Sequence, residues 1–214
     1  YAAGIVAYYK SAPTAALPMT VKGCHNTGEV STAYNYAGGI AAYVNNYISI
    51  SDCYNTGNVS ATIGAAGIAA NFGSASSTME RCWNSGDITV SESRAGGIAG
   101  QNTVKSTMTD CFNTGSITNS AATVTAAANG HATKGYGVGG VVGEGGGNMS
   151  RCYNTGTVTD LGLKTAGNPG AAIGVMHADY SEGSYLEVKD VYYRACGLEG
   201  LGMMVYSTMH DPSV

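Results

Sequence analysis

Charged side chains are scarce in this sequence of 214 residues. Asp, Glu, Lys and Arg together make up 11% of the chain, whereas an ordinary globular domain carries about 25%. The chain also has 32 glycines and 44% apolar residues. This composition is typical of a protein with many short strands of small residues and is unlike that of a compact enzyme. The net charge is −4 and there is no run of basic residues, so no nucleic-acid partner is expected.

Long hydrophobic runs are missing as well. No apolar stretch approaches the ~18 residues that a membrane-spanning helix needs, so no membrane span is predicted in this segment. A starting methionine and a secretory signal are also absent, because the chain begins at Tyr1. We interpret the chain as a processed or excised segment of a longer product.

What the sequence does contain is an internal repeat. The first four cysteines follow one another at intervals of 29 residues, and the next interval is 41 residues. A fixed period of this size indicates a stacked repeat architecture. The longer interval is 29 plus 12, and its extra residues fall in an Ala/Thr/Gly-rich stretch, which predicts an insertion at about 119–136.

Two blocks alternate within each repeat. One reads "CYNTGNV" from Cys53, and the other reads "AGGIAAY" from Ala37. Segments rich in Val, Ile, Thr and Tyr that are broken by Asn-Thr-Gly and Gly-Gly are strand and turn signals. The sequence therefore predicts an all-β fold, a parallel β-solenoid of about five to six coils with neighbouring coils ~4.8 Å apart.

The blocks also predict the domain organisation. Residues 1–23 read as a partial first coil because "YAAGIVAYY" matches the second block. Residues 24–188 hold the repeats, with coils beginning near 24, 53, 82, 111 and 152. Residues 189–214 are interpreted as a degenerate terminal repeat with a cap or tail, in which Val191 takes the cysteine position and Tyr192 the aromatic position.

If the coils stack in register, each repeat position becomes a column. The position before the cysteine alternates in charge, and opposite charges on neighbouring strands stabilise a sheet, so we interpret this column as a device that sets the register. We expect each charge to lie between two opposite ones. The column contains Asp52, Arg81, Asp110, Arg151 and Asp190.

Three further columns follow the charged one. Aromatic residues one coil apart stack on each other and form the candidate contact surface, asparagine amides hydrogen-bond from coil to coil, and glycines supply a positive φ at the turn. The aromatic column contains Tyr54, Trp83, Phe112 and Tyr153. The asparagine column contains Asn26, Asn55, Asn84, Asn113 and Asn154. The glycine column contains Gly28, Gly57, Gly86, Gly115 and Gly156.

The direction of the side chains depends on one bend. A methionine column precedes the cysteines by three residues, and strict alternation from it would bury the charged column, which is costly. We therefore expect a bend just before the charged residues, with the cysteines inside and the aromatic residues at least partly exposed.

The cysteine column leaves three interpretations open: buried free thiols, disulfides between coils, or a metal site. Its members are Cys24, Cys53, Cys82, Cys111 and Cys152. Carboxylates are scattered and no histidine shares the spacing of the cysteines, so we predict no catalytic residues and no cofactor.

On the "CYNTG" block, the alternating "AGGIAG" block and the terminal "VYY", the sequence resembles the GLUG-motif repeats of bacterial surface proteins. The resemblance covers nearly the whole chain. It implies a secreted or surface-displayed bacterial solenoid, because such repeats occur in large extracellular adhesins. It carries over no catalytic residue, since the motif has none.

We therefore expect a non-enzymatic, extracellular structural or adhesive module of the bacterial cell surface. Its expected partners are other copies or the remainder of a longer surface protein through the coil ends, end to end as in a filament, and a glycan or host protein on its sides. The alternatives are a polysaccharide-active β-helix enzyme, either a lyase or a hydrolase, and an ice-binding solenoid.

Overall fold

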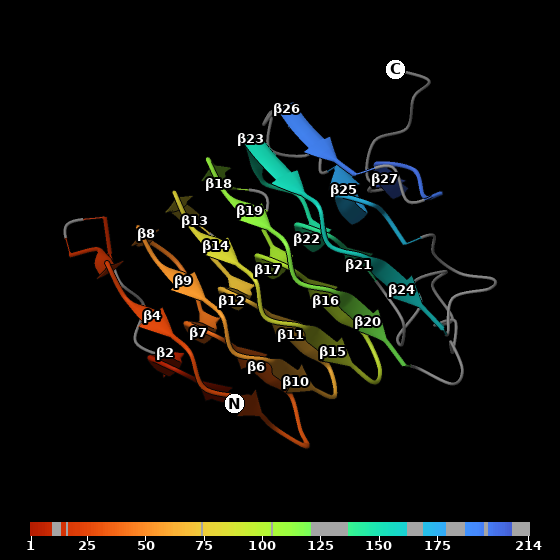
Figure 1. Ribbon diagram of the computed structural model, residues 1–214. Coiled ribbons are helices and arrows are strands. Elements are labelled where there is room, and N and C mark those ends of the chain that lie inside the picture. Colours follow the sequence, from red (N-terminus) through yellow and green to blue (C-terminus); the bar gives the residue numbers. More distant parts are fainter. Residues whose placement is uncertain are drawn as a thin grey trace.

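A computed structural model describes residues 1–9, 14–15, 17–73, 75–103, 105–120, 137–161, 169–178, 187–194 and 197–206. These residues form strands and turns without a helix, so none of them belongs to a helix that could span a membrane. Successive coils lie side by side, each strand next to its counterpart from the coil before (Figure 1). The predicted all-β parallel solenoid is confirmed.

Two sheets form one half of the cross-section. Sheet 1 carries the Gly-Gly block and consists of β1 (Ala2–Ala3), β6 (Tyr36–Gly38), β11 (Gly64–Ala66), β16 (Arg94–Gly96) and β21 (Val138–Gly139). Sheet 2 follows the Asn-Thr-Gly turn and consists of β5 (Val30–Ser31), β10 (Val59–Ala61), β15 (Ile88–Val90), β20 (Ile117–Asn119) and β24 (Val158–Asp160).

Two larger sheets form the other half. Sheet 3 consists of β2 (Val6–Tyr9), β7 (Ala41–Val44), β12 (Ala69–Phe72), β17 (Ala99–Asn102), β22 (Val142–Gly145), β25 (Ile173–Ala178) and β27 (Leu201–Tyr206). Sheet 4 holds the strands before the charged column: β3 (Met19–Lys22), β8 (Ile48–Ser51), β13 (Ala75–Glu80), β18 (Lys105–Thr109), β23 (Asn148–Asn154) and β26 (Val188–Tyr193). It also holds the short strands of the recurring block: β4 (His25–Asn26), β9 (Tyr54–Asn55), β14 (Trp83–Asn84) and β19 (Phe112–Asn113).

The strands of these sheets pair in parallel and follow the 29-residue repeat. Trp83 pairs with Phe112 across β14 and β19. The register also survives the longer interval, since Met108 pairs with Met149. Most of the predicted insertion lies outside the described residues, as do Cys196 and the last eight residues of the predicted tail. In the terminal strand β26, Val191 pairs with Cys152 and Tyr192 with Tyr153, as the sequence alignment predicted.

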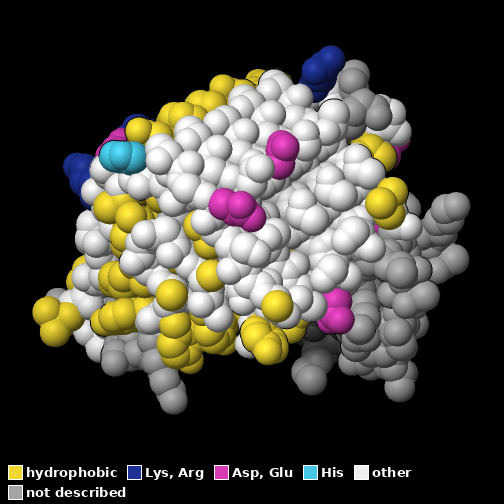
Figure 2. Space-filling model, turned by 60° about the horizontal axis from the view of Figure 1, so that its bottom comes forward, with side chains coloured by type: hydrophobic (Ala, Val, Ile, Leu, Met, Phe, Trp, Pro, Cys, Tyr) yellow, Lys and Arg dark blue, Asp and Glu magenta, His cyan; other side chains and the backbone are white. Residues whose placement is uncertain are grey.

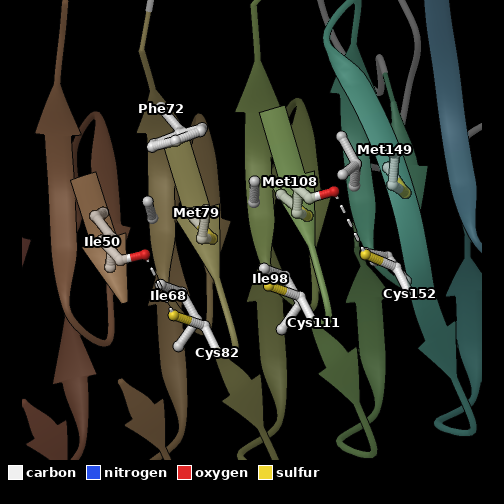
Figure 3. Close-up of a cluster of buried hydrophobic side chains, with 14 of the residues drawn as sticks. Ile50, Ile68, Phe72, Met79, Cys82, Ile98, Met108, Cys111, Met149 and Cys152 are labelled. Carbon is white, nitrogen blue, oxygen red and sulfur yellow. Dashed lines mark hydrogen bonds between the residues drawn. The ribbon is translucent and has the colours of Figure 1, made fainter. Parts of the chain in front are cut away.

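The interior consists of two apolar lobes. The larger lobe lies between sheets 3 and 4 and contains the methionine and cysteine columns, whose sulfur atoms face the same core (Figure 3). The smaller lobe lies between sheets 1 and 2 and contains Val59, Ile88 and Ile117. The smaller lobe is filled by small and β-branched residues, whereas the larger lobe also buries Phe72 and the methionines.

A waist of asparagine and glycine separates the two lobes. The buried side chain of Asn84 packs directly against Gly67, where a Cβ would lie 2.2 Å from the Asn84 Cγ. Asn113 packs against Gly97 in the same way. The asparagine of one block and the second glycine of the other block therefore touch across the interior. This contact explains why the two blocks alternate along the chain.

Each coil bends sharply at the charged column itself. Asp52, Arg81, Asp110 and Arg151 have φ of 55°, 51°, 55° and 51°, which is left-handed backbone. The prediction placed the bend one step earlier. The charged residue carries it because a single left-handed residue resets the alternation of side chains, so that the charge points outward and the next cysteine points inward.

Candidate functional site

The recurring block forms parallel columns along one side of the solenoid, and the innermost of these is an asparagine ladder. Each Nδ2 donates to the Oδ1 of the asparagine in the next coil, at 2.7 Å from Asn26 to Asn55, 2.8 Å from Asn55 to Asn84, 2.7 Å from Asn84 to Asn113 and 2.8 Å from Asn113 to Asn154. Each Nδ2 also donates to the carbonyl of the glycine two residues later. The ladder therefore satisfies its own buried polar atoms without a ligand.

The glycine column works differently from its prediction. None of its five glycines has a positive φ, so that interpretation was wrong. A Cβ at Gly86 would instead lie 2.0 Å from the carbonyl oxygen of Gly57, one coil away. From the second coil on, glycine is required because the turn approaches the preceding coil too closely for any side chain, whereas Gly28 in the first of these turns has no such neighbour.

The aromatic column is a continuous stack of rings. Neighbouring centroids lie 4.6 Å apart for Tyr54 and Trp83, 5.9 Å for Trp83 and Phe112, and 4.9 Å for Phe112 and Tyr153, and the planes are within 5° of parallel. Each pair adds roughly 0.5–1.5 kcal/mol beyond its burial. The rings cover one another's faces, so the stack offers mainly ring edges to solvent. Its role as a contact surface stays a prediction.

The charged column forms bidentate ion pairs. Arg81 donates to Asp52 at 2.6 and 3.1 Å, and Arg151 donates to Asp110 at 2.6 and 2.8 Å. Each arginine thus pairs with the aspartate of the preceding coil, whereas its attraction to the aspartate of the following coil acts without a direct bond. Asp110 and Arg151 thus lie between two opposite charges, as expected, but each bonds directly to only one of them.

Replacing Arg81 by aspartate should lower the urea midpoint of unfolding more than replacing it by asparagine. Both substitutes tolerate the left-handed backbone, and both remove the ion pairs of Arg81 with Asp52 and Glu80. The two variants therefore differ in the repulsion among the new carboxylate, Asp52, Glu80 and Asp110. That difference should shrink by more than half in 1 M NaCl, where the Debye length is about 3 Å. A gap that salt leaves unchanged would show that the column does not act through charge.

The same pairs predict a dependence on pH. The hydrogen bond from Arg81 lowers the pKa of Asp52 below its ordinary value of 3.8, and Arg151 does the same for Asp110. Because the folded-state pKa is the lower one, the stabilisation is present above about pH 4 and is lost as the pH falls through the lowered value.

The cysteine column consists of free thiols. Cys53, Cys82, Cys111 and Cys152 are fully buried and Cys24 is partly buried. Each buried thiol donates to the carbonyl two residues earlier, and the Sγ–O distances are 3.1 Å for Cys53, 3.3 Å for Cys82, 3.2 Å for Cys111 and 3.3 Å for Cys152. Burial raises the pKa of the Cys111 thiol, which opposes thiolate chemistry at this residue, whereas hydrogen bonds with Cys111 lower the pKa of Cys82 and Cys152. Within the described ranges, no three His, Cys, Asp or Glu side chains gather as metal ligands.

Alkylation under native conditions should therefore modify Cys24 and spare the other four cysteines of the column. Their reaction requires opening of the core, so we expect it to be at least about a hundredfold slower than that of Cys24. In urea without a reductant all five should react. Iodoacetamide labelling with peptide mass spectrometry measures this, and a pair that reacts in urea only after reduction would reveal a disulfide.

A cluster of tyrosines that the repeat pattern did not predict lies on the outer faces of sheets 1 and 3. The ring of Tyr1 lies 4.7 Å from that of Tyr8, 5.9 Å from that of Tyr36 and 5.5 Å from that of Tyr43. These positions hold other residues in later coils, so the repeat gave no signal for them.

The fold and the recurring Cys-aromatic-Asn-Thr-Gly block define a class of protein. It is a parallel β-solenoid in which amides, thiols and aromatic rings stack in register from coil to coil. In a comparison with protein families, residues 33–60 match the GLUG motif. The matched segment runs from the turn before β6 into β10, so it includes one passage from the Gly-Gly block to the Asn-Thr-Gly block. The chain therefore contains the GLUG repeat, as the resemblance predicted. Neither the comparison with curated proteins nor that with solved structures gave a match.

Proposed function

We propose that this chain is a non-enzymatic structural and adhesive module of an extracellular bacterial surface protein. The asparagine ladder carries the proposal. Its amides bond from coil to coil from Asn26 to Asn154, so the polar groups of the recurring block serve stacking rather than chemistry. A stack of this kind is quasi-one-dimensional and grows by adding equivalent coils, which suits a spacer that holds a binding surface away from its anchor.

Two observations on the described residues favour this proposal over the alternatives that the sequence left open. A polysaccharide-cleaving enzyme needs acid and base groups that converge on one bond. Glu29 and Asp87 share a column, but the coil of Asn58 lies between them, and Glu144 pairs with Arg94. The same acidic column interrupts the flat hydroxyl array that ice binding would use. No depolymerisation of pectin, alginate, chitin or cellulose is expected, and product formation from any of them would contradict the proposal.

Duplicating residues 53–110 tests the structural role directly. The duplication adds two coils and keeps the alternation of Asp and Arg in the charged column. Small-angle scattering should show a particle longer by about 10 Å, and the melting temperature should be equal to or higher than that of the parent chain. A less stable product would show that the coils are not interchangeable structural units.

Duplicating only residues 82–110 provides the matched control. It adds one coil but places two copies of Asp110 on neighbouring strands, where like charges repel. This variant should melt below the two-coil variant in low salt.

For partners, we propose that the solenoid associates with further coils of a longer surface protein or of a second copy. The support is general, since a parallel sheet presents unpaired backbone groups at the coil where it ends. Light scattering over a concentration series measures self-association, and a constant monomer mass up to millimolar protein would leave only the longer protein as partner.

A further inference from the structure

Two neighbouring columns on the outer faces of sheets 1 and 3 form a surface separate from the asparagine, aromatic and charged columns. The sheet 3 column consists of Tyr8, Tyr43, Asn71, Gln101 and Glu144, which pair in this order along the axis. The sheet 1 column consists of Tyr1, Tyr36, Gly64 and Arg94, which align in the same direction. We refer to these nine residues as the tyrosine–amide strip.

One end of the strip is aromatic and accessible. Tyr1 and Tyr8 are each 45% exposed, and the Tyr36 and Tyr43 rings lie 5.8 Å apart at a tilted angle. Hydrophobic side chains gather at one end of the molecular surface (Figure 2). Unlike the stacked aromatic column, the cluster joins its rings at mixed angles, from 12° between Tyr1 and Tyr36 to 67° between Tyr1 and Tyr43.

The other end of the strip is a network of planar polar groups. Asn71 donates to Gln101 at 2.9 Å, and Arg94 forms an ion pair with Glu144. Asn71 and Glu144 are buried, with 7% and 6% exposure, so these groups are held in place rather than free in solvent. The ion pair leaves the network without net charge.

Gly64 connects the two ends. A Cβ there would lie 2.6 Å from Cδ1 of Tyr36, so the glycine gives this ring room to lie over the next coil. Arg94 interacts with Tyr36 as well as with Glu144. The strip therefore runs without a break along the solenoid axis, from the exposed tyrosines to the more buried polar groups.

We infer that the tyrosine–amide strip binds a neutral oligosaccharide along the solenoid axis. Pyranose rings present apolar C–H faces that pack on aromatic rings, and their hydroxyls both donate and accept, as do the amides and the Arg–Glu pair. The paired charges favour an uncharged glycan over a uronic acid polymer. This inference deepens the proposed function, on which it rests, because it gives the adhesive role a site and a ligand class.

Calorimetry with cellohexaose and chitohexaose tests the inference on the full chain. At least one of these neutral hexasaccharides should bind, and hexagalacturonate should bind at least tenfold more weakly. Tyr43→Ala should weaken binding of the neutral ligand at least tenfold, whereas Tyr43→Phe, which keeps the ring, should stay within threefold. Tyr34→Ala is the matched control, because Tyr34 is 76% exposed and lies outside the strip, and it should bind like the parent chain.

Two further measurements keep the outcome decisive. Tyr8→Ala replaces Tyr43→Ala if the latter does not melt at the parent temperature. Emission from Trp83, the single tryptophan, should stay unchanged on binding, because this residue lies in the aromatic column on sheet 4. Absence of binding by both neutral ligands, binding that survives the loss of Tyr43 and Tyr8, stronger binding of hexagalacturonate, or a shift in Trp83 emission would overturn the inference. The coil-duplication test measures only the length and stability of the solenoid. Its failure would contradict the proposed structural role, whereas a failure of glycan binding would contradict only the present inference.

Discussion

Replacing Gly86 by alanine is expected to lower the free energy of unfolding by about 3 kcal/mol, the upper part of the usual range for overpacking. The added Cβ would lie 2.0 Å from the Gly57 carbonyl oxygen and 3.1 Å from Nδ2 of Asn55. Neither atom yields easily, since one belongs to the backbone of a neighbouring coil and the other to the asparagine ladder. Urea unfolding monitored by Trp83 emission and by circular dichroism measures the loss.

Gly28 is the matched control for this prediction, because it occupies the same position of the repeat. A Cβ at Gly28 would meet a single atom, Oδ1 of Asn26, at 3.9 Å. Gly28→Ala should therefore change stability by less than about 0.5 kcal/mol, or raise it slightly by restricting the unfolded chain. If the column served to provide a positive φ, both substitutions would cost the same, about 1–2 kcal/mol.

The contrast between these two glycines shows where sequence reasoning ended. The repeat identifies a position where only glycine occurs, and a turn beside Asn-Thr is the ordinary reason for such a glycine. Close approach between coils gives the same sequence pattern. The two causes differ only in φ and in the distance to the neighbouring coil, and both are properties of the stacked structure.

The columns themselves could be predicted because they depend on register alone. Once the 29-residue period is read, Trp83 has to pair with Phe112, and Met108 has to pair with Met149, as they do. The inward direction of the cysteines also followed, since burying the charged residues instead would have been costly. The position of the bend did not follow, because an arginine in left-handed backbone is not a pattern that local propensity predicts.

The tyrosine–amide strip could not be predicted for the opposite reason. Its two columns keep tyrosine only over the first two coils and then change, from Tyr43 to Asn71 to Gln101, so the repeat that reveals the other columns hides most of this one. Only the folded sheets bring Arg94 next to Glu144, which is 50 residues away in the chain. At positions where the coils differ, side chains are not required for stacking, so a solenoid can place binding residues there.

Replacing Asn84 by aspartate is expected to cost about 4 kcal/mol at neutral pH, within the usual range for leaving a charged group in a broken buried network. The Asn84 Nδ2 donates to Asn113 Oδ1 at 2.7 Å and to the Gly86 carbonyl at 2.8 Å. A carboxylate cannot donate to either acceptor, and its site is fully buried. Rotating the Asn113 amide would relieve only the first contact, and it would break the bond from Asn113 to Asn154.

The cost of the Asn84→Asp substitution should depend on pH with a definite sign. Burial and the two facing acceptors raise the folded-state pKa of the new carboxyl above its unfolded value of about 3.9. Below that unfolded value the protonated acid can donate one hydrogen bond, so the variant should lie nearest to the parent chain there. Its deficit should then grow as the pH rises towards the folded pKa, by at most about 1.4 kcal/mol per pH unit, and become constant above it.

Subtracting the parent chain at each pH removes the acid sensitivity of Asp52 and Asp110 from this comparison. Urea titrations between pH 3 and pH 8 give the difference directly, and Asn35→Asp at an exposed turn is the control that should show almost no deficit. If the deficit in unfolding free energy for Asn84→Asp stayed constant over this range, the Asn84 amide would stabilise the fold by packing alone and not by donating hydrogen bonds. A deficit that rises with pH would show that hydrogen-bond donation from coil to coil holds the ladder, and with it the waist between the two lobes, together.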